Sequence, residues 1–178
     1  KYAKRTVDAK ARTHLIKRKS SIFSPPCREA LYAKNYEEAL AINKKITGKG
    51  ISIQAYNISP KIKAVDEWLN TKPKDLDIYE AHPELCFKSL NNDKDLQYSK
   101  HDKKGLIERQ NLLFNLDHNL KSIYEDILKT YKRKQVKPDD IFDAIALYLI
   151  AKKKHPLQYI SDENNVDATG KSVQIVFG

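Results

Sequence analysis

The sequence predicts an α/β fold in which helices pack on a mixed sheet. Two observations support it: long stretches carry apolar residues at helical spacing, and two short segments have β character. At 178 residues the chain has the usual size of one domain, so we expect a single domain over residues 1–178. Two strands are too few for a sheet, and the chain begins at Lys1 and contains no methionine. We therefore expect the domain to be incomplete at its N-terminus, with its first strands upstream.

Helices are expected wherever apolar side chains recur at steps of three and four residues. The expected spans are residues 6–16, 36–46, 55–69, 83–90, 105–115, 120–131 and 139–153, with a further short helix after the two prolines at 25 and 26. Pro60 interrupts the third span and predicts a kink or the start of a new helix there. Strands are expected at residues 76–81, which alternate between polar and apolar side chains, and at residues 172–177.

The composition predicts a soluble protein that attracts polyanions. The net charge is +10, and residues 1–20 hold eight Lys or Arg side chains against one acid, Asp8. Such a field favours nucleic acid through phosphate contacts, although a solvated lysine-rich surface would give the same composition. Cys27 and Cys86 are far apart and in no metal-ligand spacing, which argues against disulfides and zinc. We therefore expect a cytoplasmic protein with no membrane contact.

An acidic cluster marks the beginning of the last expected helix. Ten of the eleven residues from 141 to 151 are apolar, and the exception is Asp143. A lone carboxylate on so apolar a helix needs a partner, because burying it unpaired is costly. Asp139 and Asp140 precede it by four and three residues and project from the same side, although both could simply cap the helix. Clustered carboxylates repel one another, so an oxygen-liganded ion such as Mg²⁺ or Mn²⁺ is expected between them.

Glu80 and His82 lie at the end of the first expected strand. Functional groups of α/β sheets gather beyond the carboxyl ends of strands, which makes Glu80 a candidate site residue. A glutamate at a strand end is also an ordinary surface residue, and His82 is more simply explained by packing. Polar loop residues beside cations could contact phosphates, namely Ser20, Ser21, Ser99, Lys100, Lys103 and Lys104. The segment 48–52 lacks the spacing and the preceding strand of a nucleotide-triphosphate loop.

Several motifs in this order resemble one known family, the ribonuclease-H-like predicted nucleases grouped as the domain of unknown function numbered 429. They are RKSSIFSPP at 18–26, TGKGISIQAY at 47–56, PKI at 60–62, EAHPE at 80–84 with Phe87, YSK at 98–100 with Gly105, and DDIFDA at 139–144. The resemblance implies a ribonuclease-H-like core in which carboxylates hold one or two magnesium ions for phosphodiester cleavage. Asp140 and Asp143 match the last-helix acids and Glu80 matches a strand-end acid. The first-strand acids have no counterpart within the chain.

Three functional hypotheses follow. The first is a metal-dependent nuclease in which Glu80, Asp140 and Asp143 bind metal, with Asp139 as an auxiliary ligand. Its phosphate-binding residues would be Lys19, Ser20, Ser21, Lys49 and Lys100. The second is a nucleic-acid-binding module with a degenerate or incomplete site and no hydrolysis. The third is a protein unrelated to nucleic acid, in which the acidic group only caps a helix.

Overall fold

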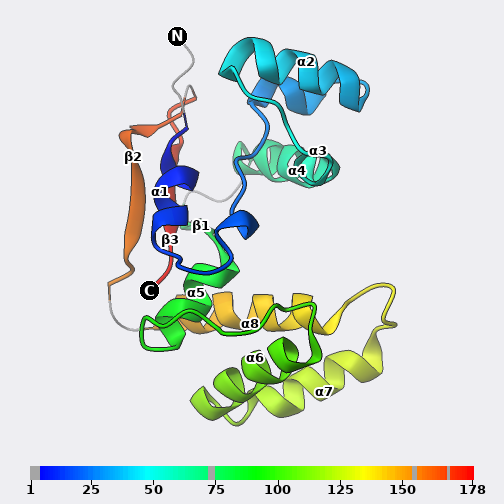
Figure 1. The fold of residues 1–178 in the computed structure, drawn as a ribbon, viewed down its shortest axis with the longest axis vertical. Helices are drawn as coiled ribbons and strands as arrows, with labels where there is room; N and C mark the ends of the chain where they lie inside the picture. Colours follow the sequence, from blue (N-terminus) through cyan, green and yellow to red (C-terminus); the bar gives the residue numbers. More distant parts are fainter. Residues whose placement is uncertain (1–4, 72–74, 154–155, 168) are drawn as a thin grey trace.

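The computed structural model describes residues 5–71, 75–153, 156–167 and 169–178 (Figure 1). This part of the chain contains eight α-helices, two short 3-10 helices and a three-stranded sheet. The helices are α1 (Val7–Thr13), η1 (Lys19–Ser21), η2 (Arg28–Tyr32), α2 (Tyr36–Thr47), α3 (Ile53–Asn57), α4 (Ser59–Leu69), α5 (Pro83–Leu90), α6 (Lys103–Leu116), α7 (Leu120–Thr130) and α8 (Pro138–Lys152). The strands are β1 (Glu80–Ala81), β2 (Tyr159–Val166) and β3 (Ser172–Val176).

The sheet is mixed, with β3 in the middle. β1 runs parallel to β3, with Glu80 opposite Ile175, and β2 runs antiparallel to it, with Ile160 opposite the same residue. Helix α1 packs on this sheet through Val7 and Ala11, which are fully buried. The α/β character expected from the sequence is therefore confirmed, although most of the structure is helical.

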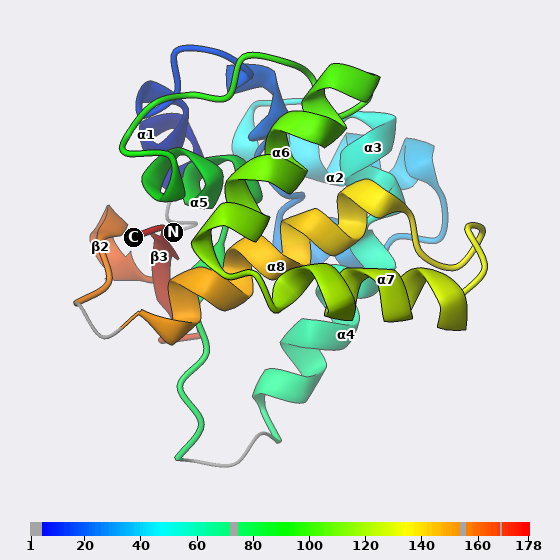
Figure 2. The same cartoon turned by 90° about the horizontal axis from the view of Figure 1, so that it is seen from below.

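A layer of four helices, α5 to α8, forms the largest core and lies at one end of the sheet (Figures 1 and 2). Phe87, Leu113 and Phe142 are buried in it, and Tyr124 stacks on Phe142 at 4.7 Å between ring centroids. Helix α8 is apolar on nearly all sides and contacts α5, α6 and α7. Asp143 therefore lies in the first turns of a helix that is packed among three others.

The remaining helices, η2 and α2 to α4, form a lobe with a small core of its own, at the upper right of Figure 1. Cys27, Ala39 and Ile51 are buried there. The buried Asn43 side chain accepts a hydrogen bond from the Cys27 backbone N–H at 2.8 Å and donates one to the Lys49 carbonyl at 2.8 Å. We call this part the helical lobe.

The expected helices are present to within a few residues, with one division. The span 55–69 is two helices, α3 and α4, and Pro60 lies in the first turn of α4, so the proline marks a new start. This follows from its missing N–H, which costs nothing in a first helical turn. The expected strand at 172–177 is confirmed as β3. Both cysteines are free and buried.

The first expected strand and the number of strands are corrected. Only Glu80 and Ala81 of the span 76–81 pair in the sheet. Strand β2 was not expected, because its sequence YISDENNV is too polar to resemble a strand by alternation alone. Strand β2 forms because it makes antiparallel hydrogen bonds with β3, and its side-chain pattern does not indicate this pairing. Within the described residues, no helix is long and apolar enough to cross a membrane.

Candidate functional site

A lysine and two aspartates meet at the start of α8. The Nζ atom of Lys100, on the loop between α5 and α6, lies 2.8 Å from Oδ2 of Asp143 and 3.8 Å from Oδ2 of Asp139. The two aspartates are four residues apart, so their carboxylates lie on one side of the helix. The ammonium group thus supplies the positive charge that these carboxylates need. The sequence predicted a phosphate contact for Lys100 and gave no sign of this pairing.

Asp143 keeps one oxygen without a partner. Its Oδ1 atom is buried and has no hydrogen-bond partner among the described residues. Burial raises the pKa of Asp143 above its ordinary value, and the hydrogen bond and charge of Lys100 offset only part of this effect. A buried acceptor left unsatisfied costs roughly 1–3 kcal/mol. Such an atom is a candidate for binding an ion or a substrate group.

A buried salt-bridge network lies beside this pair. Nη2 of Arg109 lies 2.6 Å from Oε1 of Glu84, and Nε of Arg18 lies 3.2 Å from Oε2 of the same carboxylate. The Arg109 side chain is 0% exposed and lies over the Phe87 ring at 5.1 Å. We call Arg18, Glu84, Lys100, Arg109 and Asp143 the buried cluster.

The network holds the loop that carries Lys100. Arg109 donates to the Tyr98 carbonyl at 3.2 Å, and Arg18 donates to the Leu96 carbonyl. The carboxylate of Glu108 accepts from the backbone N–H groups of Gln97 and Tyr98 at 2.7 and 3.0 Å. Two carbonyls and two N–H groups of residues 96–98 are thereby hydrogen-bonded, so the backbone that leads to Lys100 is anchored.

Gly105 allows this loop to lie directly on α6. A Cβ atom at this position would be 1.8 Å from the Ser99 carbonyl oxygen, which is far inside van der Waals contact. Only glycine leaves room for the backbone of residues 98 and 99. The glycine that follows the YSK motif at 98–100 therefore has a steric role.

His82 caps α5 and is held in one orientation. Its Nδ1 atom accepts a hydrogen bond from the Glu84 N–H at 3.3 Å, which leaves the proton on Nε2, 3.2 Å from the Ser21 carbonyl oxygen. Burial lowers the pKa of His82, although the hydrogen bond to Ser21 and the nearby Glu84 and Asp143 charges partly oppose this. The histidine is therefore a neutral packing residue that joins α5 to η1.

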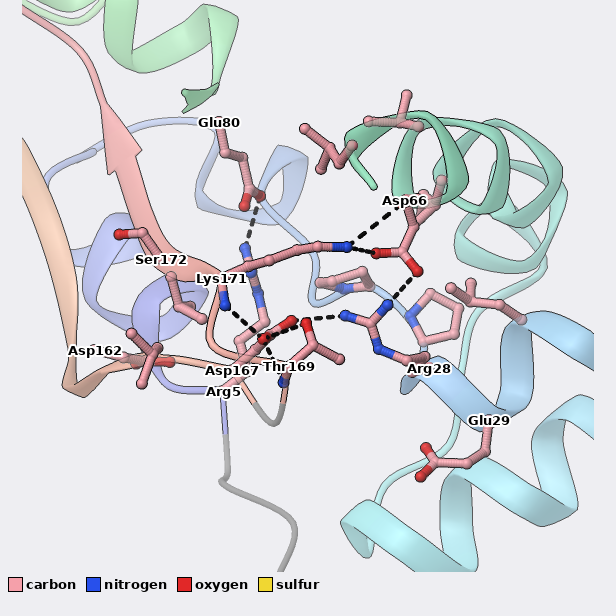
Figure 3. Close-up of a pocket in the computed structure, with 18 of the residues that line it drawn as sticks. Arg5, Arg28, Glu29, Asp66, Glu80, Asp162, Asp167, Thr169, Lys171 and Ser172 are labelled. Atoms are coloured by element: carbon pink, nitrogen blue, oxygen red, sulfur yellow. Dashed lines mark hydrogen bonds and ion pairs between the residues drawn. The ribbon is translucent and has the colours of Figure 1, made fainter. Parts of the chain in front are cut away.

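Glu80 lies in a different environment. Its carboxylate pairs with Nη2 of Arg5 at 2.6 Å and is half exposed, and Arg5 also pairs with the buried Asp8 at 2.9 Å. Glu80 lines a cavity of about 360 Å³ between the sheet and the helical lobe (Figure 3). The structure thus gives Glu80 an arginine partner on the cavity side.

The same cavity is bridged by a second set of charges, which we call the clamp. Arg28 of η2 pairs with Asp66 of α4 and, at 2.6 Å, with Asp167 of the β2–β3 turn. Lys171 lies 2.8 Å from Asp66 (Figure 3). Hydrogen bonds from Lys171 and Arg28 hold the pKa of Asp66 below its ordinary value. Burial acts to raise the pKa of Asp167, but hydrogen bonds from Thr169 and Lys171 outweigh it and lower that pKa.

The other expected site residues are dispersed. Asp140 is exposed, and its Oδ2 accepts from the Lys137 backbone N–H at 3.4 Å, as a helix cap does. Lys19 and Ser20 are exposed on η1, and Ser21 follows them there, so these three lie next to His82. Lys49 lies beyond the end of α2, in the helical lobe.

Two aspartates beside Lys100 carry the kind of oxygen atoms that divalent metals prefer. Asp139 and the free Oδ1 of Asp143 offer the carboxylate oxygens that Mg²⁺ and Mn²⁺ prefer. Across the described ranges, no group of three or more His, Cys, Asp or Glu side chains is arranged to hold a metal ion. Asp139 and Asp143 are thus two candidate ligands that Lys100 already contacts, and metal binding by them, Glu80 and Asp140 stays a prediction.

Fold and site together define an α/β protein with a charged cluster where its helices meet. The chain belongs to the family described as protein of unknown function (DUF429), whose model matches residues 1–159. The resemblance inferred from the sequence motifs is thereby confirmed at the level of the family, whose description names no activity. No curated protein and no solved structure matches the chain.

Proposed function

We propose that the protein is a metal-dependent nuclease of the ribonuclease-H-like class that hydrolyses phosphodiester bonds in nucleic acid. The observation that carries this proposal is the Asp143 carboxylate, which is largely buried, lies beside Asp139 and keeps one oxygen without a partner. The resemblance of the sequence motifs to predicted nucleases and the net charge of +10 support it further. The carboxylate suits a divalent cation, and the net charge suits a polyanionic substrate.

The residues of the chain have separate roles in this proposal. Asp143 and Asp139 hold Mg²⁺ or Mn²⁺, with Glu80 and Asp140 as the further carboxylates that the resemblance implies. When bound, such an ion positions a water molecule and stabilises charge on the phosphate. Lys100 provides a cation for a phosphate oxygen, and the Glu84–Arg109 pair keeps its loop in place. Both arginine contacts act through the backbone, so Arg18 and Arg109 are positioning residues.

One observation favours a second candidate function, a nucleic-acid-binding module without hydrolysis. The Lys100 ammonium already pairs with Asp139 and Asp143 and offsets one of their two negative charges, so their repulsion is reduced without a metal. In that case the site would be a structural ion pair and binding would depend on the surface cations.

The test is cleavage of a panel of single- and double-stranded DNA and RNA by the full-length protein with Mg²⁺ or Mn²⁺. Asp143→Asn should lower the cleavage rate by at least about 100-fold, the effect of removing a group that stabilises transition-state charge. Asp126→Asn is the matched control, because Asp126 is an exposed aspartate on α7 whose carboxylate pairs, among the described residues, with Lys129 alone. Salt-sensitive binding without cleavage in any metal would leave the second candidate and sink the first.

A further inference from the structure

One end of the helical layer carries many exposed basic side chains. Figure 1 places the start of α6, the end of α7 and the start of α8 toward this end, and Figure 2 shows them spread out, with the start of α8 between the other two. We call it the basic end, and its exposed cations are Lys103, Lys104, Lys132, Arg133, Lys134 and Lys137. In the described part of the chain, no ion pair joins any of the six to a carboxylate. A polyanion can therefore bind these cations without displacing a carboxylate of the described chain.

Two of these cations lie at the end of a helix where the helix dipole disfavours positive charge. Lys103 and Lys104 occupy the first turn of α6, and this turn contains no acidic residue. The N-terminus of a helix is its positive end, where a cation costs and an acid gains roughly 0.3–1 kcal/mol. Cations after the end of α7, in contrast, suit the negative end of that helix. The helix dipole thus favours the lysines after α7 but not those of α6, where Asp102 at the N-cap position offsets part of the cost.

Exposed tyrosines lie among the cations. Tyr98 and Tyr131 are 45% and 49% exposed, and Nζ of Lys104 lies 5.5 Å from the centroid of the Tyr98 ring. The Tyr98 backbone is held by Arg109 and Glu108, so this ring projects from a rigid loop. Aromatic rings interleaved with cations are the means by which proteins bind single strands, because unpaired bases stack on the rings.

The basic end adjoins the acidic site. Lys137 precedes Asp139 by two residues, and Lys100, which contacts Asp139 and Asp143, follows Tyr98 by two. A strand bound along the basic end would therefore pass next to these two carboxylates. The arrangement combines phosphate contacts, stacking rings and a candidate site in one surface.

We propose that the basic end binds single-stranded nucleic acid, with its cations on the phosphates and with Tyr98 and Tyr131 stacked on bases. This inference rests on the proposed function for the class of polymer. It does not require cleavage or a metal. DNA and RNA share the chemistry involved, and the experiment distinguishes them.

The experiment measures binding of fluorescent single-stranded DNA and RNA oligonucleotides, and of the matching duplexes, to the full-length protein in EDTA at a series of salt concentrations. Each phosphate contact to a single strand contributes about 0.7 to the slope of log K against log salt. The triple variant Lys132→Gln, Arg133→Gln, Lys134→Gln should therefore lower that slope by about 2. The control triple Lys34→Gln, Lys44→Gln, Lys45→Gln changes the charge equally on exposed residues of the helical lobe and should leave the slope unchanged.

Stacking is tested separately. Tyr98→Ala and Tyr131→Ala should each weaken single-strand binding about fivefold or more, and Tyr→Phe at the same position should restore it. Equal slope changes in the two triple variants, tighter binding of the duplex, or tyrosine variants without effect would each overturn the inference.

Its failure is distinguishable from failure of the nuclease proposal. If the basic-end variants lose binding but no cleavage occurs with any metal, the inference stands and the nuclease proposal falls. If cleavage occurs and its KM is unchanged in the basic-end triple variant, the inference falls and the nuclease proposal stands.

Discussion

The buried cluster and the clamp are both networks of acidic and basic side chains, and they differ in how completely their polar atoms are paired. In the clamp, Arg28 and Lys171 together serve Asp66 and Asp167, and the pKa values of both carboxylates are lowered (Figure 3). In the buried cluster, Asp143 has a raised pKa and an oxygen without a partner, and Nε of Arg109 also has no partner among the described residues. The clamp therefore fits a purely structural role, whereas the buried cluster has unpartnered polar atoms that could bind a ligand.

The largest expected effect comes from breaking the buried cluster. Arg109→Met removes the fully buried guanidinium and leaves Glu84 with only the longer contact to Arg18. Removing one partner of a buried pair typically costs about 3–5 kcal/mol, and we expect a loss of this size in the free energy of unfolding, measured by urea titration. The double variant Glu84→Gln, Arg109→Met should recover part of the loss. A single variant as stable as the wild type would show that the pair is not important for stability.

The next effect tests whether the Lys100 loop depends on close packing. Gly105→Ala places a Cβ against the Ser99 carbonyl, so the loop has to shift. Alanine normally favours a helix over glycine, but overpacking of this kind costs about 1–3 kcal/mol, so we expect a lower melting temperature. Asn111→Ala, at an exposed position of the same helix, should be neutral or slightly stabilising. A Gly105→Ala protein more stable than the wild type would contradict the contact.

The two networks should respond to acid with opposite signs. The pKa of Asp66 in the folded protein is below 3.8, so its stabilising contribution is present above pH 3.8 and is lost as the pH falls through the lower value. The pKa of Asp143 is above 3.8, so the folded protein loses stability as the pH rises from 3.8 through that higher value.

Unfolding free energies of the wild type, Asp66→Asn and Asp143→Asn between acidic and neutral pH measure these contributions. Asp66→Asn should flatten the curve below pH 3.8, at a cost of up to about 1 kcal/mol at neutral pH. Asp143→Asn should flatten it above pH 3.8. Identical curves for the two variants would contradict the assigned pKa directions.

The smallest effect concerns local opening, for which each region contains its own reporter. Cys27 lies in the core of the helical lobe and Cys86 in that of the helical layer, where burial raises its thiol pKa to about 12. If the clamp contributes about 1 kcal/mol to closing the lobe, Asp66→Asn should speed labelling of Cys27 by a thiol reagent about fivefold. Labelling of Cys86 should not change. Faster labelling of Cys86 instead would contradict the prediction that the clamp stabilises the helical lobe.

Sequence reasoning identified Asp143 because one carboxylate on an apolar helix is visible as a break in a local pattern. Its partner Lys100 is 43 residues away, and no periodicity connects the two. Arg109 was missed because a single arginine in a predicted amphipathic helix is normally assigned to the solvent face. The signal that could have found it is its spacing of four residues from Gly105, which places both on one side of α6.

The fold was likewise predictable where it depends on neighbouring residues and not where it depends on distant ones. Helices depend on neighbouring residues, so their spans were predictable to within a few positions. Strand β2 depends on pairing with β3, and its polar sequence gave no indication of that. Whether Glu80 would face Asp143 or Arg5 depended on the packing of α1 against the sheet, which the sequence does not encode locally.

The Lys100 ammonium has a further consequence in the proposed enzyme. It is a counter-ion that the chain carries itself, attached by a loop whose backbone is already fixed. Even a short flexible tether gives a group an effective concentration in the millimolar range. A divalent cation would thus compete for the aspartates with the Lys100 ammonium, which dilution cannot remove because it belongs to the same chain. Occupancy of the aspartates would then depend on the ionic composition of the surroundings and on whether Lys100 keeps its charge.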